Sequence, residues 1–192
     1  MTLTERVDYL LLKWRARAWL TLGQSTRARQ AMDEMLARWP EDAYGLSSRA
    51  HLRASQGDAS GAIEDARRLV RLHPSRSAAD WFNLAFMLEA RGDLAEAEPA
   101  FRRALELDPK LDRAWYGLGL TLIRQHRLEE AVSALRRTTQ LQPMSPYGWY
   151  QLARVHMDRS EPEETRKIIR HLQAFEPKVA AQLERETGLR AG

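Results

Sequence analysis

Apolar and small residues recur along this chain in blocks of one length, and inside each block they follow the spacing of amphipathic helices. In the third block Trp81, Leu84, Ala85 and Leu88 are separated by three or four residues, which places them on one face of a helix. A second run of the same kind follows after a short polar turn. The pattern therefore predicts two helices of about 12–15 residues in each block, typical of an all-α protein.

Prolines mark the length of the block. Five of the eight prolines are separated by 34, 35, 34 and 34 residues, namely Pro40, Pro74, Pro109, Pro143 and Pro177. Proline cannot continue a helix, so each of them marks the same stop. Tryptophan keeps the same period, because Trp81, Trp115 and Trp149 each precede one of these prolines by 28 residues. Leu12 and Leu46 occupy this position, here called the Trp slot, in the first two blocks.

Small residues form two columns in the aligned blocks. The first column lies four residues after the Trp slot and contains Ala16, Ala50, Ala85, Gly119 and Ala153. The second contains Ala28, Ala62, Ala97, Ala131 and Thr165, and a bulky column follows it with Met32, Phe101, Leu135, Ile169 and, as its small exception, Ala66. We expect the small columns to let paired helices approach closely, with the bulky residues filling the space between hairpins.

A turn separates the two helices of each block. It contains Gly23, Gly57-Asp58 and Gly92-Asp93 in the first three blocks, and His126 and Ser160 in the last two. Glycine favours the left-handed conformation that ends a helix, and aspartate can cap the next one.

These residues resemble the signature of the tetratricopeptide repeat family. The third block matches best, through Trp81, Leu84, Ala85, Leu88, Gly92, Ala97, Phe101, Ala104 and Pro109. The resemblance extends over about residues 9–177 and implies a right-handed α-α superhelix, or solenoid, of about five helical hairpins. We expect one domain over residues 1–192, with repeats at 9–40, 43–74, 78–109, 112–143 and 146–177 and a capping helix at 178–188, with Val179 and Leu183 on its apolar face.

Two features depart from the pattern. Arg15, Arg49 and Arg53 stand where later repeats carry apolar residues. A buried arginine needs a carboxylate partner, so either these hairpins leave the arginines half-exposed with packed stems, or the arginines contact a partner molecule. Pro99 lies inside a predicted helix, and we expect a kink there without a break.

Composition narrows the class of protein. The chain has no cysteine, which excludes disulfides and cysteine-based zinc sites. No apolar stretch is long enough for a signal peptide or a membrane span, so we expect a soluble, cytoplasmic protein without membrane contact. Lysine accounts for only four of the 30 basic residues, and the arginines are spread over every segment at a net charge of +4.

Catalytic and cofactor motifs are missing from the sequence. The five histidines do not form an HExxH motif, there is no phosphate-binding glycine loop, and there is no GxSxG nucleophile elbow. Carboxylates are plentiful but fall at turns and predicted solvent-facing positions. We therefore expect no enzymatic activity, no cofactor and no metal site.

The resemblance implies that the first helix of each hairpin lines a concave groove that binds partners. Positions one, two and five after the Trp slot, and two before it, then face the groove. The predicted partner-binding residues are Lys13, Trp14, Arg17, Tyr44, His51, Phe82, Asn83, Phe86, Arg113, Tyr116, Tyr147, Tyr150 and Arg154. Aromatic residues beside arginine are typical of interaction hot spots. They favour a protein or peptide segment with apolar side chains and some acidic character.

Other functions stay open at this point. Groove aromatics and the basic balance would also suit nucleic-acid binding, although the arginines are scattered over the chain. The chain could also be a regulatory or oligomerisation domain of a larger enzyme. Self-association is a further possibility, because exposed aromatics can drive dimers.

Overall fold

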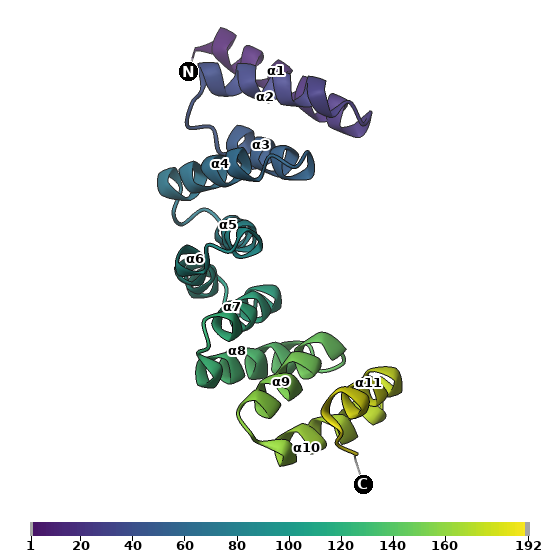
Figure 1. Cartoon of the computed structure of the whole chain (residues 1–192). Coiled ribbons are helices and arrows are strands. Elements are labelled where there is room, and N and C mark those ends of the chain that lie inside the picture. The colour runs from purple at the N-terminus through teal and green to yellow at the C-terminus, as the bar shows by residue number, and fades with distance from the viewer. Residues whose placement is uncertain (1, 191–192) are drawn as a thin grey trace. The chain divides into compact units, whose positions relative to one another are not determined.

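The computed structural model describes residues 2–190, which form eleven α-helices and no strand (Figure 1). The helices are α1 (Leu3–Thr21), α2 (Ser25–Arg38), α3 (Ala43–Ser55), α4 (Ala59–Leu72), α5 (Ala78–Arg91), α6 (Leu94–Leu107), α7 (Asp112–Arg124), α8 (Leu128–Leu141), α9 (Pro146–Asp158), α10 (Pro162–Gln173) and α11 (Pro177–Thr187). Each predicted repeat contains two of these helices, called A and B here in chain order. The predicted all-α fold of five hairpins and a terminal helix is confirmed.

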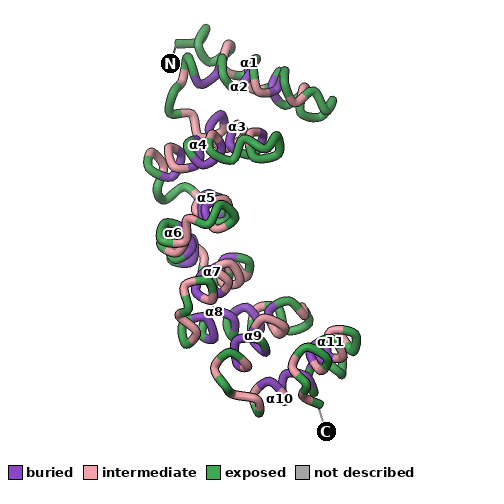
Figure 2. The backbone as a smooth tube through the Cα atoms, viewed as in Figure 1, coloured by how far each residue is buried: buried purple, intermediate pink, exposed green. Residues whose placement is uncertain are grey.

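The chain divides into two compact units. Unit 1 extends to Met87 and unit 2 begins at Leu88, so the boundary falls inside α5. In both, the buried residues gather on the helix faces that meet, as Figure 2 shows.

Unit 1 is held together by small apolar clusters between successive helices. Ala16 of α1, Leu52 of α3 and three residues of α2 form one cluster, against which Trp19 packs. Leu36, Leu46 and Leu69 form a second cluster between α2, α3 and α4. The α3–α4 hairpin therefore packs on the preceding B helix, α2, as well as within itself, which is how repeat arrays gain stability.

The two central arginines of unit 1 meet a buried carboxylate. Asp65 of α4 is 2% exposed, and its two oxygens accept hydrogen bonds from Arg49 Nε at 2.8 Å and Arg49 Nη2 at 2.7 Å. Arg53 Nη1 donates to the same carboxylate at 3.0 Å and to the Gly61 carbonyl at 3.1 Å. The hydrogen bond to Asp65 raises the pKa of Arg49. An internal carboxylate thus supplies the partner that a buried arginine requires. Arg15 pairs with Glu34 at the surface.

Unit 2 packs bulky side chains of B helices against glycines of A helices. A Cβ atom built on Gly117 would lie 2.4 Å from the Phe101 ring, and one on Gly119 would lie 2.9 Å from Leu135. Both distances are shorter than real Cβ contacts, so a larger residue at either position would require the Phe101 or Leu135 side chain to move. The second small column is fully buried along the whole chain, at Ala28, Ala62, Ala97, Ala131 and Thr165. The predicted packing role of these columns is confirmed.

The turns between A and B helices share one backbone conformation. Gly23, Gly57 and Gly92 have positive φ, and His126 and Ser160 take the same left-handed conformation at φ 60°. Asp58 caps α4 by accepting from Gly61 N at 2.9 Å, as predicted. The corresponding prediction for Asp93 is wrong, because its carboxylate accepts from Arg91 Nε instead and makes no cap hydrogen bond.

The shared period of tryptophan and proline has a structural cause. The indole Nε1 of Trp115 donates to the Pro109 carbonyl, and that of Trp149 to the Pro143 carbonyl, both at 2.9 Å. Trp81 makes the same bond to Pro74 at 2.8 Å. Each bond closes the connection between one repeat and the next A helix, so both residues belong to one local structure.

The two ends and the internal proline complete the fold. α1 begins at Leu3 with a capping box between Thr2 and Glu5. α6 continues through Pro99. α11 contacts α10 and α9, buries Ala180 and Leu183, and ends at Gly188 with φ 70°.

Candidate functional site

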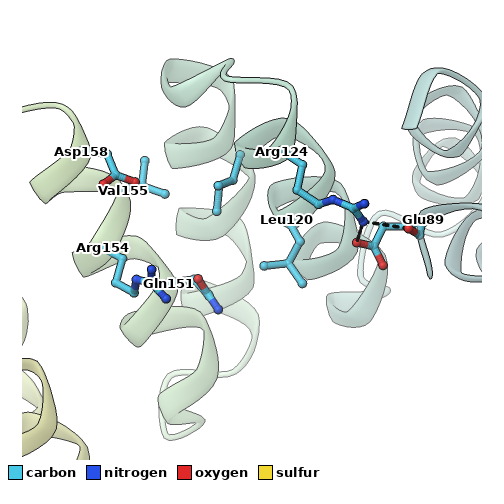
Figure 3. A pocket seen from close by; sticks show the side chains of 8 residues that line it. Glu89, Leu120, Arg124, Gln151, Arg154, Val155 and Asp158 are labelled. Atoms are coloured by element: carbon cyan, nitrogen blue, oxygen red, sulfur yellow. Dashed lines mark hydrogen bonds and ion pairs between the residues drawn. The ribbon is translucent and has the colours of Figure 1, made fainter. Parts of the chain in front are cut away.

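The A helices of unit 2 enclose a cavity of about 200 Å³ (Figure 3). Three consecutive A helices contribute to it. Its lining consists of Glu89 from α5, Leu120, Ile123 and Arg124 from α7, and Gln151, Arg154, Val155 and Asp158 from α9. The cavity thus lies on the helices that the resemblance assigns to partner binding.

One wall of the cavity is fixed by an ion pair. Arg124 Nη1 donates to Glu89 Oε1 at 2.6 Å and to the Glu89 carbonyl at 2.8 Å, as the dashed lines in Figure 3 show. Two bonds from one guanidinium nitrogen hold α5 and α7 in register at this point. Leu120 and Ile123 supply apolar surface beside this pair. The wall combines an apolar contact surface with a positioned charge.

The other side of the cavity is ordered by the terminal helix. The Arg154 guanidinium lies 5.8 Å from the centre of the Tyr150 ring. The Tyr150 hydroxyl donates to Glu186 Oε2 of α11 at 2.7 Å, and this bond, together with burial, raises the pKa of Tyr150. Gln182 Nε2 donates to the other oxygen of Glu186 at 2.8 Å and is the largest cause of the lowered pKa of that carboxyl group. α11 therefore both caps the last hairpin and positions Tyr150.

The predicted site residues of unit 2 fall into two groups. Arg154 lines the cavity and Tyr150 adjoins it. Arg113, Tyr116 and Tyr147 lie outside the cavity lining, and Tyr147 is 71% exposed. Their part in partner binding stays a prediction.

The predicted residues on α1 and α3 make contacts with each other. Lys13 Nζ lies 4.6 Å from the centre of the Tyr44 ring, which joins the two A helices by a cation–π contact. The Arg17 guanidinium lies 5.5 Å from the Trp14 ring. His51 is exposed. These residues are available at the surface, and their role also stays a prediction.

The predicted residues on α5 differ in exposure. Phe82 is buried, at 9% exposed, whereas Phe86 is 57% exposed and stacks on it with ring centres 6.1 Å apart. Asn83 is exposed. Phe82 thus offers a partner little surface.

Sequence reasoning missed five of the eight residues that line the cavity. Val155 lies six residues after the Trp slot, and Glu89, Ile123, Arg124 and Asp158 lie eight or nine residues after it, about one turn beyond the last predicted position. Extending the same helical face toward the C-terminus of each A helix would have included them.

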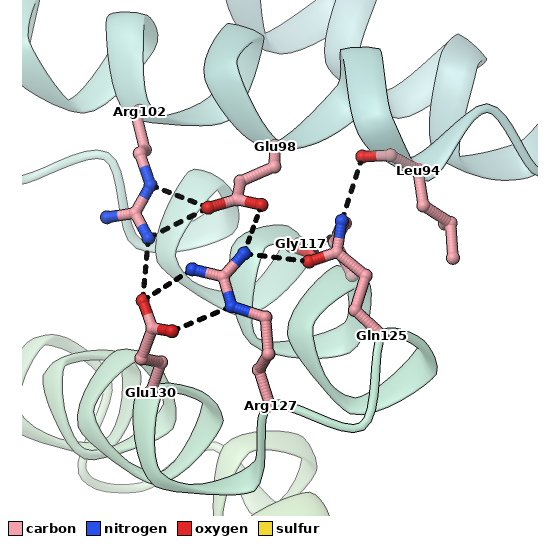
Figure 4. Close-up of polar contacts among 8 residues, drawn as sticks. Leu94, Glu98, Arg102, Gly117, Gln125, Arg127 and Glu130 are labelled. Atoms are coloured by element: carbon pink, nitrogen blue, oxygen red, sulfur yellow. Dashed lines mark hydrogen bonds and ion pairs between the residues drawn. The ribbon is translucent and has the colours of Figure 1, made fainter.

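A second polar network lies on the B helices of unit 2 (Figure 4). Glu98 accepts from Arg102 Nε at 3.0 Å and from Arg127 Nη1 at 2.5 Å, and Glu130 accepts from Arg127 Nε and Nη2, both at 2.7 Å. A further bond from Arg102 Nη2 to Glu130 closes the network. Each arginine therefore contacts both carboxylates.

Metal-binding clusters and membrane-spanning helices are absent from the described part of the chain. Within residues 2–190, no group of three or more His, Asp or Glu side chains is placed to hold a metal ion. None of the helices described combines the length and the apolar character needed to cross a membrane.

Known proteins agree with this architecture. Two tetratricopeptide repeat family models match residues 47–112 and 88–154, together more than half of the chain. The structure is similar to that of the MamA protein (TM-score 0.82, 18% identity, 95% of this chain and 96% of that chain). It is also similar to MamA from Desulfovibrio magneticus RS-1 (TM-score 0.78, 18% identity, 94% and 97%). YrrB, a TPR protein with an unusual peptide-binding site, gives a TM-score of 0.80 at 17% identity over 88% of both chains. No curated protein matches in sequence.

Proposed function

The chain belongs to the tetratricopeptide repeat family and is a protein-interaction scaffold, and from this premise we propose that the A-helix cavity of unit 2 receives a side chain from an extended or helical segment of a partner protein. The scaffold acts without catalysis and contributes to the assembly of a larger complex. The cavity on three successive A helices is the observation that carries the proposal.

The size of the cavity supports a peptide side chain as the occupant. Sites for small molecules and cofactors usually enclose about 300–1,000 Å³, whereas this cavity measures about 200 Å³. It is therefore suited to one or two side chains that project from a longer chain. YrrB, which shares the fold, is described as a peptide-binding protein, and this favours the same class of ligand here.

The lining indicates the chemistry of the ligand. Leu120, Ile123 and Val155 provide apolar contacts, while the Arg154 guanidinium can bind a carboxylate of the partner through two parallel hydrogen bonds. The Arg124 guanidinium is already held by Glu89, so Arg154 is the cation that we assign to the ligand. The expected segment carries an apolar residue followed closely by Asp or Glu.

Ion pairing weighs against nucleic acid as the main partner. Nucleic-acid binding draws on arginines that are free to contact phosphates, and in unit 2 Arg102 and Arg127 are bound to Glu98 and Glu130. These two arginines are therefore already engaged by carboxylates.

Site-specific photo-crosslinking tests the proposal. We would replace Gln151 by p-benzoyl-phenylalanine and irradiate the protein in native lysate. Ser133, an exposed residue of the B helix α8, provides the control position. We expect a discrete protein crosslinked from position 151 and not from position 133, and its loss in the Leu120→Ala/Arg154→Ala variant.

The proposal would be wrong if both positions gave the same products, or if the cavity variant kept the crosslink. Products that disappear after nuclease treatment would instead indicate a nucleic-acid ligand. Circular dichroism of the cavity variant checks that the loss does not reflect unfolding.

A further inference from the structure

The outer face of α1 is apolar and uncovered. Leu12 and Ala16 are buried on the face that packs into unit 1, and on the opposite face large apolar side chains are exposed. Their exposed fractions are 81% for Leu3, 48% for Val7, 51% for Leu10, 62% for Leu11 and 66% for Trp14. Leu3, Val7, Leu10 and Trp14 follow a spacing of four, three and four residues, so they form one continuous stripe along the helix. This set of five residues is called the α1 stripe.

The repeat indicates what such a face normally contacts. Leu11 of α1 corresponds to Gly45 of α3, which is buried and whose Cβ position lies 3.0 Å from Leu36 of α2. Ala18 corresponds to Leu52 of α3, which packs in the cluster that includes residues of α2. In α3 these two positions are therefore covered by residues of the preceding B helix, α2. In α1 Leu11 and Ala18 are both exposed, so this part of the helix surface already suits a packed helix.

Basic side chains lie along one edge of the α1 stripe. Arg6, Lys13 and Arg17 lie along one side of it on the helical wheel. Residues 2–39 carry seven basic and four acidic side chains, a net charge of +3, and all four acids are engaged, because Asp8 pairs with Arg38, Glu34 with Arg15, Asp33 with Arg49 and Glu5 with the Thr2 backbone. The surface around the stripe is therefore basic.

We propose that the α1 stripe docks an amphipathic helix of a partner protein, with apolar residues on one face and acidic residues along one edge. The partner helix would pack on α1 as α2 packs on α3, and its acidic edge would face Arg6 and Arg17. This surface lies in unit 1 and is independent of the unit 2 cavity.

A second copy of this chain fits the surface less well. In an antiparallel pair of α1 helices, equivalent edges face each other, which places Arg6, Lys13 and Arg17 against the same residues of the other copy. Like charges at this position oppose the contact. Head-to-tail stacking would need the last B helix, α10, to be uncovered, and α11 packs against it.

The expected affinity follows from the size of the face. α1 has 19 residues and is therefore about 28 Å long, so one helix laid along it buries less than the roughly 800 Å² per partner of a standard interface. We expect binding in the micromolar range.

The test uses designed helical peptides of about 18 residues. One peptide carries leucine at i, i+3, i+4 and i+7 with glutamate along one edge, and its matched control carries lysine in place of glutamate. Fluorescence anisotropy of labelled peptides is measured at protein concentrations up to about 100 μM. We expect the glutamate peptide to bind the full chain about tenfold or more tightly than the lysine peptide.

Two variants assign binding to the stripe. Leu11→Ser/Trp14→Ser alters only exposed side chains and should abolish binding, while Met144→Ser, at a comparably exposed position outside the predicted partner-binding residues, should leave it unchanged. Arg6→Glu/Arg17→Glu should reverse the preference in favour of the lysine peptide. Unchanged melting temperatures show that the variants are folded.

The proposal is overturned if the glutamate peptide does not bind, or if Leu11→Ser/Trp14→Ser binds it like the wild type. It is also overturned if the stripe serves another partner. That result would be a dimer in analytical ultracentrifugation that the stripe variant abolishes, or stripe-dependent co-sedimentation with vesicles containing about 30% phosphatidylserine in the absence of peptide binding.

Discussion

Units 1 and 2 fill the same places of the repeat with opposite chemistry. Three and seven residues after the Trp slot, unit 2 has Leu118 and Leu122, and nineteen residues after it Ala134, all buried. The second repeat, in unit 1, has Arg49, Arg53 and the buried Asp65 at these places. The helices α3 and α4 nevertheless form the same hairpin as α7 and α8. The hairpin therefore accepts either an apolar trio or a complete ionic one.

The difference shows that charged residues are tolerated at these buried positions when every one of them has an oppositely charged partner. Arg49 Nη1 also donates to Asp33 of α2 at 2.8 Å, so the ionic trio reaches the preceding hairpin. A buried ion pair that keeps all its hydrogen bonds offsets its desolvation, but it is seldom more stable than an apolar replacement of similar volume.

Removing only the carboxylate should do the most damage. Asp65→Ala leaves Arg49 and Arg53 without their buried partner, and we expect the free energy of unfolding to fall by about 3–5 kcal/mol. Urea denaturation followed by circular dichroism measures the change. The control is Asp33→Ala, which removes an exposed partner of Arg49 and should cost less than about 1 kcal/mol. Equal losses in both variants would contradict a central role for Asp65.

Replacing the whole trio should restore most or all of that stability. The variant Arg49→Leu/Arg53→Leu/Asp65→Ala copies the pattern of unit 2 and should unfold within about 1 kcal/mol of the wild type, or be more stable than it. The same urea measurement applies. If the triple variant were as unstable as Asp65→Ala, unit 1 would require the charged residues themselves, and an apolar trio could not replace them.

The turns differ between the units in a similar way. Unit 1 has glycine at both left-handed turns, whereas in unit 2 only the first turn has glycine, Gly92, and the other two have His126 and Ser160 at φ 60°. His126→Gly and Ser160→Gly should each raise stability by about 0.5–1 kcal/mol, because glycine adopts this conformation without steric cost. Gly57→Ala should lower it by about 1 kcal/mol. Melting temperatures provide the readout, and a gain in Gly57→Ala would refute the argument.

Acid should weaken unit 2 modestly through its surface network. Burial opposes ionisation of Glu98, but hydrogen bonds from Arg127 and Arg102 lower its pKa, and the bond from Arg127 is the largest cause of the lowered pKa of Glu130. A carboxyl group whose pKa is lower in the folded protein than in the unfolded chain, where it is near 4.3, stabilises the fold above that pH. This stabilisation is lost as the pH falls through the pKa of the folded state.

This contribution can be isolated by removing the cation. Arg127→Met should flatten the decline of melting temperature between about pH 4.5 and pH 3, relative to the wild type. Arg103→Met, which breaks a surface pair with Glu106, serves as the control and should leave the slope nearly unchanged. An unaltered slope in Arg127→Met would show that the network does not contribute to the loss of stability in acid.

Much of the fold could be predicted because the packing residues of each repeat recur at fixed positions in the sequence. The period of Pro40 to Pro177 and of the three tryptophans defined the hairpins, and the glycine turns marked their tips. The cap assigned to Asp93 was wrong because a nearby arginine competes for its carboxylate. Local pattern cannot rank two partners that lie within reach of one side chain.

The candidate site was less accessible from the sequence. The cavity combines Glu89, Arg124 and Asp158 from three repeats, and their positions depend on how neighbouring A helices pack. The burial of Phe82 illustrates the same limit, because Phe82 and Phe86 lie four residues apart with similar chemistry and only the packed structure distinguishes their exposure.

The sequence by itself determined the helical repeat, its length, its turns and the small residues at its contacts, since these depend on spacing within about 34 residues. The tertiary structure alone decided which charges meet. Arg49 and Asp65 are 16 residues apart, and Arg124 and Glu89 are 35 residues apart. Electrostatic and packing energies depend on distances in space, and for these pairs those distances arise only when one helix is laid against the next.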